Sequence, residues 1–416
     1  MSTTRPPTGR LPEYLTGLPS ASHRIFPVAT DLARRLVQTP SPSGDESRAA
    51  GLVMEAMRGF GYDEVWDDEA GNVIGLLRGS GDGPRVQFNT HLDHVSPGDH
   101  ALWARPPYDG VIDDGVLYGR GASDLKGSMA AQVALVPTLR EAGLTPRGDV
   151  FVVAVVLEEV GGFGSRHLAT TLPTDVAVVG EPSQNEIRRG HRGRIFVRVT
   201  FTGLSTHASA PERGRNPHFA VARFLLGVES LAMVSSDTFG GSSMSPTSIE
   251  TDQVSGNVTP GSVSISLDWR NVPGEDEAAV LAKVQDAANQ AIAEVDGITA
   301  QVSVAVRPVT TYTGMTDVMP STLAFETAAD DPVVLTARDA LTAAFGRPVP
   351  VGTWTFATDG GHLHNLGVTT IGFGPGEERF AHTIHDQIAL SQVEEAILGN
   401  AVLALALTSP AGETWV

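Results

Sequence analysis

The chain has 416 residues and a formal net charge of −19, from 29 Lys and Arg against 48 Asp and Glu. This length predicts more than one domain, because a single hydrophobic core stops growing near about 250–300 residues. The negative charge argues against nucleic acid and anionic membranes as partners, since both present negative phosphates. The chain contains no cysteine, so disulfides, thiolate metal sites and cysteine nucleophiles are excluded. Any metal site must therefore use His, Asp and Glu.

The first 22 residues contain several Pro, Ser and Thr but no apolar run like that of a signal peptide. We expect them to form a loose N-terminal arm. No later stretch is expected to be long and apolar enough to span a bilayer. A cytoplasmic location is the resulting prediction.

Residues 23–188 are predicted to form the first part of an α/β catalytic domain. Apolar residues at helical spacing indicate helices over 24–37, from about 45 to 59 and over 128–142. Short strands are expected at 65–66 and 73–77, and a hairpin at 111–118. Apolar runs predict buried strands over 86–90, 150–157 and 176–179. This pattern of strands and helices favours a mixed sheet covered by helices.

The pattern changes between residues 189 and 308. Alternating polar and apolar residues predict half-exposed strands over 195–202 and 263–269, a third strand is expected over 300–306, and helices over 216–233 and 278–295. Residues 240–248 are rich in Gly and Ser and are interpreted as a loop. The content is that of a small, inserted ferredoxin-like α+β domain. Residues 309–416 return to the first pattern, with helices over 332–345 and from 391, and strand-like segments near 353–356 and 369–373.

A His-x-Asp pair follows the predicted strand over residues 86–90. His91 and Asp93 point the same way, because alternate side chains of a strand share a face. An imidazole and a carboxylate placed together suit a divalent metal, with Asp93 as a ligand or as the group that orients His91. Taken alone, the pair also fits a capped strand end with an ordinary histidine.

Other apolar segments also end in acids or histidines. Strand ends of an α/β sheet converge on one crevice, where crowded carboxylates repel one another and take up protons unless cations neutralise them. Two metals ~3.5–4 Å apart that share one carboxylate form a hydrolytic centre. Two histidines with three carboxylates suit zinc, with manganese or cobalt as alternatives. The further residues at these ends are Asp124, Glu158, Glu159, Glu181, His382 and His385.

The adjacent glutamates Glu158 and Glu159 point to opposite faces if they continue a strand. Only a bend or the strand end lets both serve one site, with one binding metal and the other free as a general base. Adjacent glutamates are also common on surfaces. Their position directly after an apolar strand and before Val-Gly-Gly favours the functional interpretation.

Together these motifs resemble the M20 family of dinuclear zinc peptidases and deacylases, of the acetylornithine deacetylase and succinyl-diaminopimelate desuccinylase type. The resemblance extends from about residue 24 to 408 and depends on segments that occur in the family's order: 90–93, 118–127, 158–162, 180–182 and 381–386. It implies that His91 and Glu181 bind one zinc, that Glu159 and His382 bind the other, and that Asp124 bridges the two.

The same resemblance implies roles for groups beside the metals. Glu158 would be the general base for a metal-activated water, and Asp93 would orient His91. His385 stands where the family usually has Asn or Asp, so it is expected to face the substrate or support a ligand rather than bind metal. Asp386 replaces the usual Glu, and His94 is expected to be an ordinary strand-end or surface residue.

The inserted domain also carries a family motif over residues 203–211. It implies that His207 reaches the site of the partner subunit in a homodimer and helps to stabilise the oxyanion. Asn257 and Arg270 fit positions that touch substrate, although Arg270 also fits a surface ion pair. The turn Thr358, Asp359, Gly360 and Gly361 resembles one that receives a substrate carboxylate through backbone N–H groups, and it also fits a plain tight turn.

The predicted function is metal-dependent hydrolysis of the amide bond in N-acylated amino acids or small peptides that carry a free carboxylate. A dipeptidase and an N-carbamoyl amino acid amidohydrolase of the same fold remain alternatives. An alternative from another class is a non-catalytic protein that binds small anions. Such a protein would be expected to lack Glu158 or metal ligands, and the sequence retains all of them.

Overall fold

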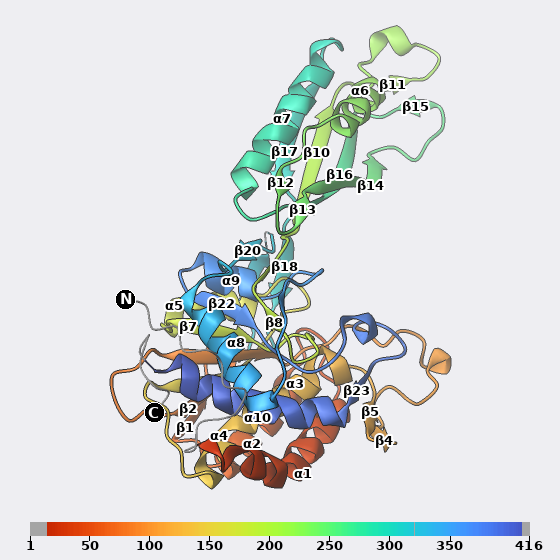
Figure 1. Cartoon of the computed structure of the whole chain (residues 1–416). Helices are drawn as coiled ribbons and strands as arrows, with labels where there is room; N and C mark the ends of the chain where they lie inside the picture. The colour runs from red at the N-terminus through yellow and green to blue at the C-terminus, as the bar shows by residue number, and fades with distance from the viewer. Residues whose placement is uncertain (1–14, 320, 410–416) are drawn as a thin grey trace, which may run out of the picture.

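A computed structural model describes residues 15–319 and 321–409, which form a large unit and a small unit (Figure 1). The small unit lies between residues 195 and 304 and has its own hydrophobic core. The chain passes between the units twice, near residues 189–194 and 305–319, and these stretches are called the crossing segments below. The expected domain bounds, 189–308 for the insertion, enclose the small unit and stay a prediction.

An eight-stranded mixed sheet forms the centre of the large unit. Strand β3 pairs in parallel with β6 and β7, β7 pairs in parallel with β22, and β2 runs antiparallel to β6. This arrangement confirms the predicted α/β class. In sheet order the strands are β1 (Glu64–Asp67), β2 (Val73–Leu77), β6 (Val150–Val155), β3 (Val86–His91), β7 (Val176–Val179), β22 (Thr369–Gly372), β8 (Ile187–Arg188) and β21 (Val351–Gly352).

Both faces of this sheet are covered, which explains why its inner strands are apolar throughout. In β6, Val150, Val152 and Ala154 join the main core, whereas Phe151 and Val153 join a second cluster on the opposite face. The helices of the large unit are α1 (Leu18–Val37), α2 (Ser47–Gly59), α3 (Gly127–Val133), α4 (Leu135–Glu141), α5 (Phe163–Thr171), α8 (Pro332–Phe345), α9 (Gly360–Asn365) and α10 (Leu390–Leu407).

Two helix predictions need correction. Helix α1 begins at Leu18 rather than near residue 24, and Leu18 and Ala21 are buried, so residues 18–22 are not a loose arm. Residues 1–14 of the predicted arm lie outside the described residues. The single helix expected over 128–142 is divided into α3 and α4, which meet at Ala134.

Helix α10 was not recognised in the sequence as long and apolar enough to cross a membrane. By length and composition it is, with a mean hydropathy of 1.3, and it alone meets that test within the described part of the chain. In the fold, 72% of it is buried, and it packs against α8, α1 and α3. It therefore serves as a core helix of the large unit.

The small unit is an antiparallel four-stranded sheet with two helices on one face. Its order is β14 (Ser243–Thr251), β16 (Ser262–Arg270), β10 (Ile195–Thr202) and β17 (Thr299–Val304), with helices α6 (His218–Glu229) and α7 (Glu277–Ala293). Along the chain this is β-α-β-β-α-β, the ferredoxin-like succession. In β16, Val263, Ile265 and Leu267 are buried under the helices, and the residues between them face outward.

Two strand predictions were wrong. Residues 243–251 form the edge strand β14 instead of a loop, because they pair with β16 although their side chains are almost all exposed. Residues 353–356 are not a strand, and the nearby strand β21 ends at Gly352. The remaining short strands are β4 (Val111–Asp113), β5 (Val116–Tyr118), β9 (Gly190–His191), β11 (Thr206–His207), β12 (Ser235–Ser236), β13 (Gly240–Gly241), β15 (Val258–Thr259), β18 (Arg307–Thr310), β19 (Thr316–Met319), β20 (Phe325–Glu326) and β23 (Gln387–Ala389).

Candidate active site

Acidic and histidine side chains gather where neighbouring strands of the large sheet end. His91 ends β3, Glu158 and Glu159 follow β6, and Glu181 follows β7. These three strands are parallel, so their carboxyl ends lie at one edge of the sheet. Asp124 comes from the one-turn segment η3 (Ala122–Lys126). His382 comes from the loop between η5 (Glu378–Phe380) and β23.

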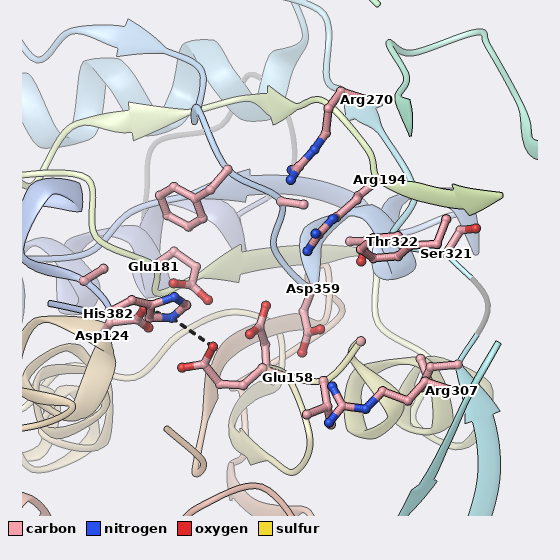
Figure 2. Close-up of a pocket in the computed structure, with 18 of the residues that line it drawn as sticks. Asp124, Glu158, Glu181, Arg194, Arg270, Arg307, Ser321, Thr322, Asp359 and His382 are labelled. Atoms are coloured by element: carbon pink, nitrogen blue, oxygen red, sulfur yellow. Dashed lines mark ion pairs between the residues drawn. The ribbon is translucent and has the colours of Figure 1, made fainter. Parts of the chain in front are cut away.

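Asp124 lies between two histidines. Its Oδ1 is 3.1 Å from His91 Nε2, and its Oδ2 is 3.1 Å from His382 Nε2. Glu181 Oε1 is 3.5 Å from the same nitrogen of His91, and Glu159 Oε2 is 2.9 Å from that of His382. The structure thus brings together all five residues predicted as ligands, and Figure 2 shows four of the site's residues, His382, Asp124, Glu181 and Glu158, on one side of the cleft.

The five side chains form two sets of three that share Asp124. One set is His91, Asp124 and Glu181, and the other is Asp124, Glu159 and His382, with the donor atoms of each set within 4.8 Å of one another. Imidazole nitrogen and carboxylate oxygen are the donors that zinc accepts in catalytic sites. The buried Oε1 of Glu159 has no hydrogen-bond partner among the described residues. This donor set therefore fits a pair of divalent ions.

The pKa shifts follow from crowding acids away from water. Burial, reinforced by neighbouring acids, raises the pKa of Glu181 well above its usual value. Hydrogen bonds to Asp124 and then to Glu159 raise the pKa of His382 to about 10. Burial opposes ionisation of Asp124, but hydrogen bonds from His382 and His91 lower its pKa. The carboxylates therefore need positive charge beside them, supplied either by protonated histidines or by cations.

Asp93 supports two parts of the cluster at once. Its backbone oxygen is 3.0 Å from His91 Nδ1, and its Oδ1 is 3.5 Å from the same nitrogen. Its carboxylate also accepts hydrogen bonds from the backbone N–H groups of Glu158 at 3.1 Å and Glu159 at 3.2 Å, and from the Ser43 hydroxyl at 2.7 Å. Asp93 therefore orients the glutamate pair as well as His91.

The glutamate pair serves one site because the chain turns sharply there. Gly161 N–H donates to the carbonyl of Glu158, and Gly162 N–H to that of Leu157, both at 2.9 Å. Gly162 has a φ of +77°, and a Cβ there would lie 2.2 Å from Asp359 Oδ1. Only glycine fits this position, which gives the Val-Gly-Gly part of the motif a structural reason.

Asp386 fixes the loop that carries Asp124, a role that the sequence did not suggest. Its buried carboxylate accepts hydrogen bonds from Gly121 N–H at 2.7 Å, Ser123 N–H at 2.9 Å and Arg120 Nη1 at 3.0 Å. The one feature of the sequence that could have indicated this role is the position of Asp386, four residues after the predicted ligand His382.

A cleft of about 580 Å³ opens between the acidic cluster and the small unit. Three arginines also line this cleft, Arg194, Arg270 and Arg307, of which only Arg270 was predicted. Asp268 forms ion pairs with two of these arginines. Its oxygens lie 2.8 Å from Arg194 Nη2 and 2.8 Å from Arg270 Nε. The Arg194 guanidinium also stacks on the Phe196 ring, 4.0 Å from its centroid.

The predicted turn at residues 358–361 reaches the cleft only through Asp359. The N–H groups proposed to receive a carboxylate are used within the turn: Gly360 N–H donates to Thr358 Oγ1 at 3.1 Å, and Gly361 N–H to Thr358 O at 3.3 Å. The predicted role of these backbone groups is therefore wrong for this arrangement. Asp359 instead presents a buried carboxylate, and burial raises its pKa to about 6.

His207 and Asn257 lie next to each other, but not in the cleft. They sit in and beside the two-stranded β11–β15 ribbon at the outer end of the small unit (Figure 1), where Ala208 N–H donates to Asn257 O at 2.8 Å. His207 is exposed, with Nδ1 2.7 Å from Ser209 Oγ. Within a single chain neither residue lines the site, so their predicted role depends on a partner subunit.

The two remaining histidines differ. His385 is exposed and does not line the cleft. His94 is buried and its Nε2 accepts a hydrogen bond from Ser41 N–H at 3.0 Å, so it is a satisfied structural residue rather than a surface one.

The fold and the site define a metallohydrolase, and comparison with known proteins gives its family. The model of peptidase family M20/M25/M40 matches residues 87–406, and the chain belongs to this family. The protein is therefore a metal-dependent hydrolase that acts on amide bonds.

Two relatives indicate how far the similarity extends. The YgeY protein of Escherichia coli strain K12 is 31% identical over 368 residues, covering 86% of this chain and 89% of that protein. The succinyl-diaminopimelate desuccinylase of Gluconacetobacter diazotrophicus is 33% identical over 261 residues, covering 58% of this chain and 67% of the relative.

Solved structures share the fold. Aminopeptidase PepT from Bacillus cereus has a TM-score of 0.72 at 20% identity, covering 92% of this chain and 98% of its own. The YXEP protein of Bacillus subtilis, described as a dinuclear metal-binding peptidase of the M20 family, has a TM-score of 0.69 at 16% identity with the same coverage.

Proposed function

We propose that the protein hydrolyses N-acylated amino acids or small peptides with two divalent ions, zinc in the first place, held by the two sets that share Asp124. The observation that carries the proposal is this shared carboxylate, with one histidine on each of its oxygens. When bound, the ions would polarise the amide carbonyl and acidify water.

Glu158 is proposed as the general base. It lines the cleft, it is held beside the cluster by the hydrogen bond from its N–H to Asp93, and it belongs to neither set of ligands. Its carboxylate takes a proton from the attacking water and passes it to the leaving nitrogen. Asp93 keeps His91 and the glutamate pair in position while the proton moves.

The substrate's free carboxylate is proposed to bind Arg270 on the opposite side of the cleft. The N-acyl amino acids are favoured over the dipeptides and N-carbamoyl amino acids only because the desuccinylase relative is named for an acyl amino acid. A panel of N-acetyl, N-succinyl, N-carbamoyl and dipeptide substrates, assayed on zinc- and manganese-loaded protein, tests the proposal. Absence of hydrolysis of all four classes with two ions bound would overturn it.

A homodimer is part of the proposal, with His207 and Asn257 completing the partner's site and His207 stabilising the oxyanion. What supports it is that both residues lie together, exposed, and away from the cleft of their own chain. Mixing His207→Ala protein with Glu158→Gln protein tests it. Mixed dimers would contain one intact site and recover activity, whereas no recovery after subunit exchange would contradict a shared site. The cytoplasmic location stays a prediction, to be checked by cell fractionation.

A further inference from the structure

The three arginines of the cleft are not equivalent. Asp268 binds both Arg194 and Arg270, so this group carries two positive charges and one negative, a local excess of one. The side chain of Arg307 makes no hydrogen bond or ion pair with any described residue. It therefore presents a second, separate positive charge to the cleft.

The two positive positions face each other across the cleft. Figure 2 shows the guanidinium groups of Arg194 and Arg270 extending from one side toward Glu158 and Asp359, and that of Arg307 extending from the other side. The two positions also belong to different parts of the chain. Arg194 directly precedes β10 and Arg270 ends β16, whereas Arg307 begins β18 in the second crossing segment. The cleft therefore offers two separate positions for an anion.

No acid among the described residues forms an ion pair with Arg307. A hydrogen bond from Ser165 engages the Asp359 carboxylate, and Glu378 Oε2 accepts a hydrogen bond from Thr355 Oγ1 at 2.8 Å. The acids of the cluster are matched by the charge of two divalent ions on the proposed assignment. A guanidinium in a cleft of a strongly acidic protein, with no acid bound to it, is suited to a carboxylate of a ligand.

We propose that Arg307 forms a second anion-binding position, so that the preferred substrates are dianionic amides: one carboxylate at the Arg194–Arg270 pair and a second at Arg307. This inference rests on the proposed function and narrows its substrate class. The second carboxylate has two possible sources, the acyl group or the amino acid side chain, which share the same chemistry.

Binding to zinc-loaded Glu158→Gln protein, measured by calorimetry, tests the inference without turnover. N-Succinyl-alanine and N-acetyl-glutamate carry the second carboxylate on the acyl group and on the side chain. Their monoanionic counterparts, in which an amide replaces the second carboxylate, are N-succinamoyl-alanine and N-acetyl-glutamine. At least one dianion should bind about tenfold or more tightly than its counterpart, as expected for a charge-assisted pair. The preference should weaken as salt is raised.

Adding Arg307→Gln to that protein should abolish the preference and leave the affinity of the monoanionic counterparts unchanged. The matched control is Arg58→Gln, which replaces an exposed arginine of α2 outside the cleft and should keep the preference. Equal binding of dianions and counterparts, no binding of either, or a preference that survives Arg307→Gln would overturn the inference. If wild-type protein hydrolyses no amide yet the preference is found, the proposed function fails and the second anion position stands.

Discussion

The two walls of the cleft are constructed in different ways. The acidic wall consists of side chains at the ends of buried strands and in two adjoining loops, and the carboxylates of Asp93 and Asp386 hold these segments by backbone hydrogen bonds. On the basic wall, Arg194 and Arg270 are 40% and 36% exposed, and Asp268 alone pairs with them. The core of the large unit thus fixes the positions of the acidic cluster, whereas Arg194 and Arg270 are held outside that core by one ion-pair partner.

The largest expected effect is on the acidic wall. Glu158→Gln keeps the shape of the side chain but removes the base, so turnover should fall about 10²–10⁴-fold. The zinc content should not change, because Glu158 belongs to neither set of ligands. Steady-state kinetics with elemental analysis measures both quantities. Wild-type turnover with two ions bound would refute the base assignment.

A smaller effect is expected behind the acidic wall. Asp386→Asn leaves the buried Arg120 without its charged partner and weakens the loop that carries Asp124. Zinc affinity should fall about 10–100-fold, as for other groups that orient ligands. Titration against a chromogenic chelator measures it, with Asp114→Asn in the exposed hairpin turn as the control. Unchanged affinity would show that the loop holds its position without this carboxylate.

On the basic wall, the expected effect is on substrate affinity and not on metal. Arg270→Gln should raise KM for carboxylate substrates about tenfold, because it removes a charge-assisted pair. Zinc content should stay at the wild-type level. The control is Arg198→Gln, since Arg198 pairs with Glu250 on the same sheet outside the cleft. An unchanged KM would favour the alternative that Arg270 makes only a surface ion pair.

The last expected effect, the smallest at neutral pH, is on the free energy of unfolding. Burial lowers the pKa of His191, which holds the backbone of Thr358, from 6.5 to about 4. Below pH 6.5 the His191 side chain of the unfolded chain takes up a proton, whereas that of the folded chain stays neutral until the pH approaches 4. The stability that neutral His191 contributes is therefore complete above pH 6.5 and is lost as the pH falls toward 4. The loss is on the order of 3 kcal/mol. Between pH 7 and pH 4.5, the free energy of unfolding measured in urea should fall less for His191→Gln than for wild type. Equal falls would contradict this role of His191.

The comparison also explains what the sequence could predict. His91, Glu159 and Glu181 end or follow buried strands, so their convergence was predictable from the strand pattern, whereas Asp124 follows a glycine turn and lies in η3. The structure brings all four together with His382. The α/β class was predictable for the same reason, because buried strands leave a clear apolar signal.

The arginines of the cleft left no such signal. Arg194 and Arg307 lie in or beside the crossing segments, where no periodicity marks a side chain as facing the cleft. Strand β14 was missed because its exposed Ser and Thr residues resemble a loop, and only pairing with β16 makes it a strand. The turn at Thr358 was misjudged because a sequence does not show whether backbone N–H groups are already bonded.

Strand β23 has a consequence for the order of events on the ribosome. It pairs with β5 and sets His382 and Asp386 against Asp124, although most of the chain's length separates them from that residue. A nascent chain that has emerged as far as the small unit holds His91, Asp124 and Glu181 but neither of the late residues. On the assignment above, the set of ligands that contains His382 is complete only after this final segment has docked against β5.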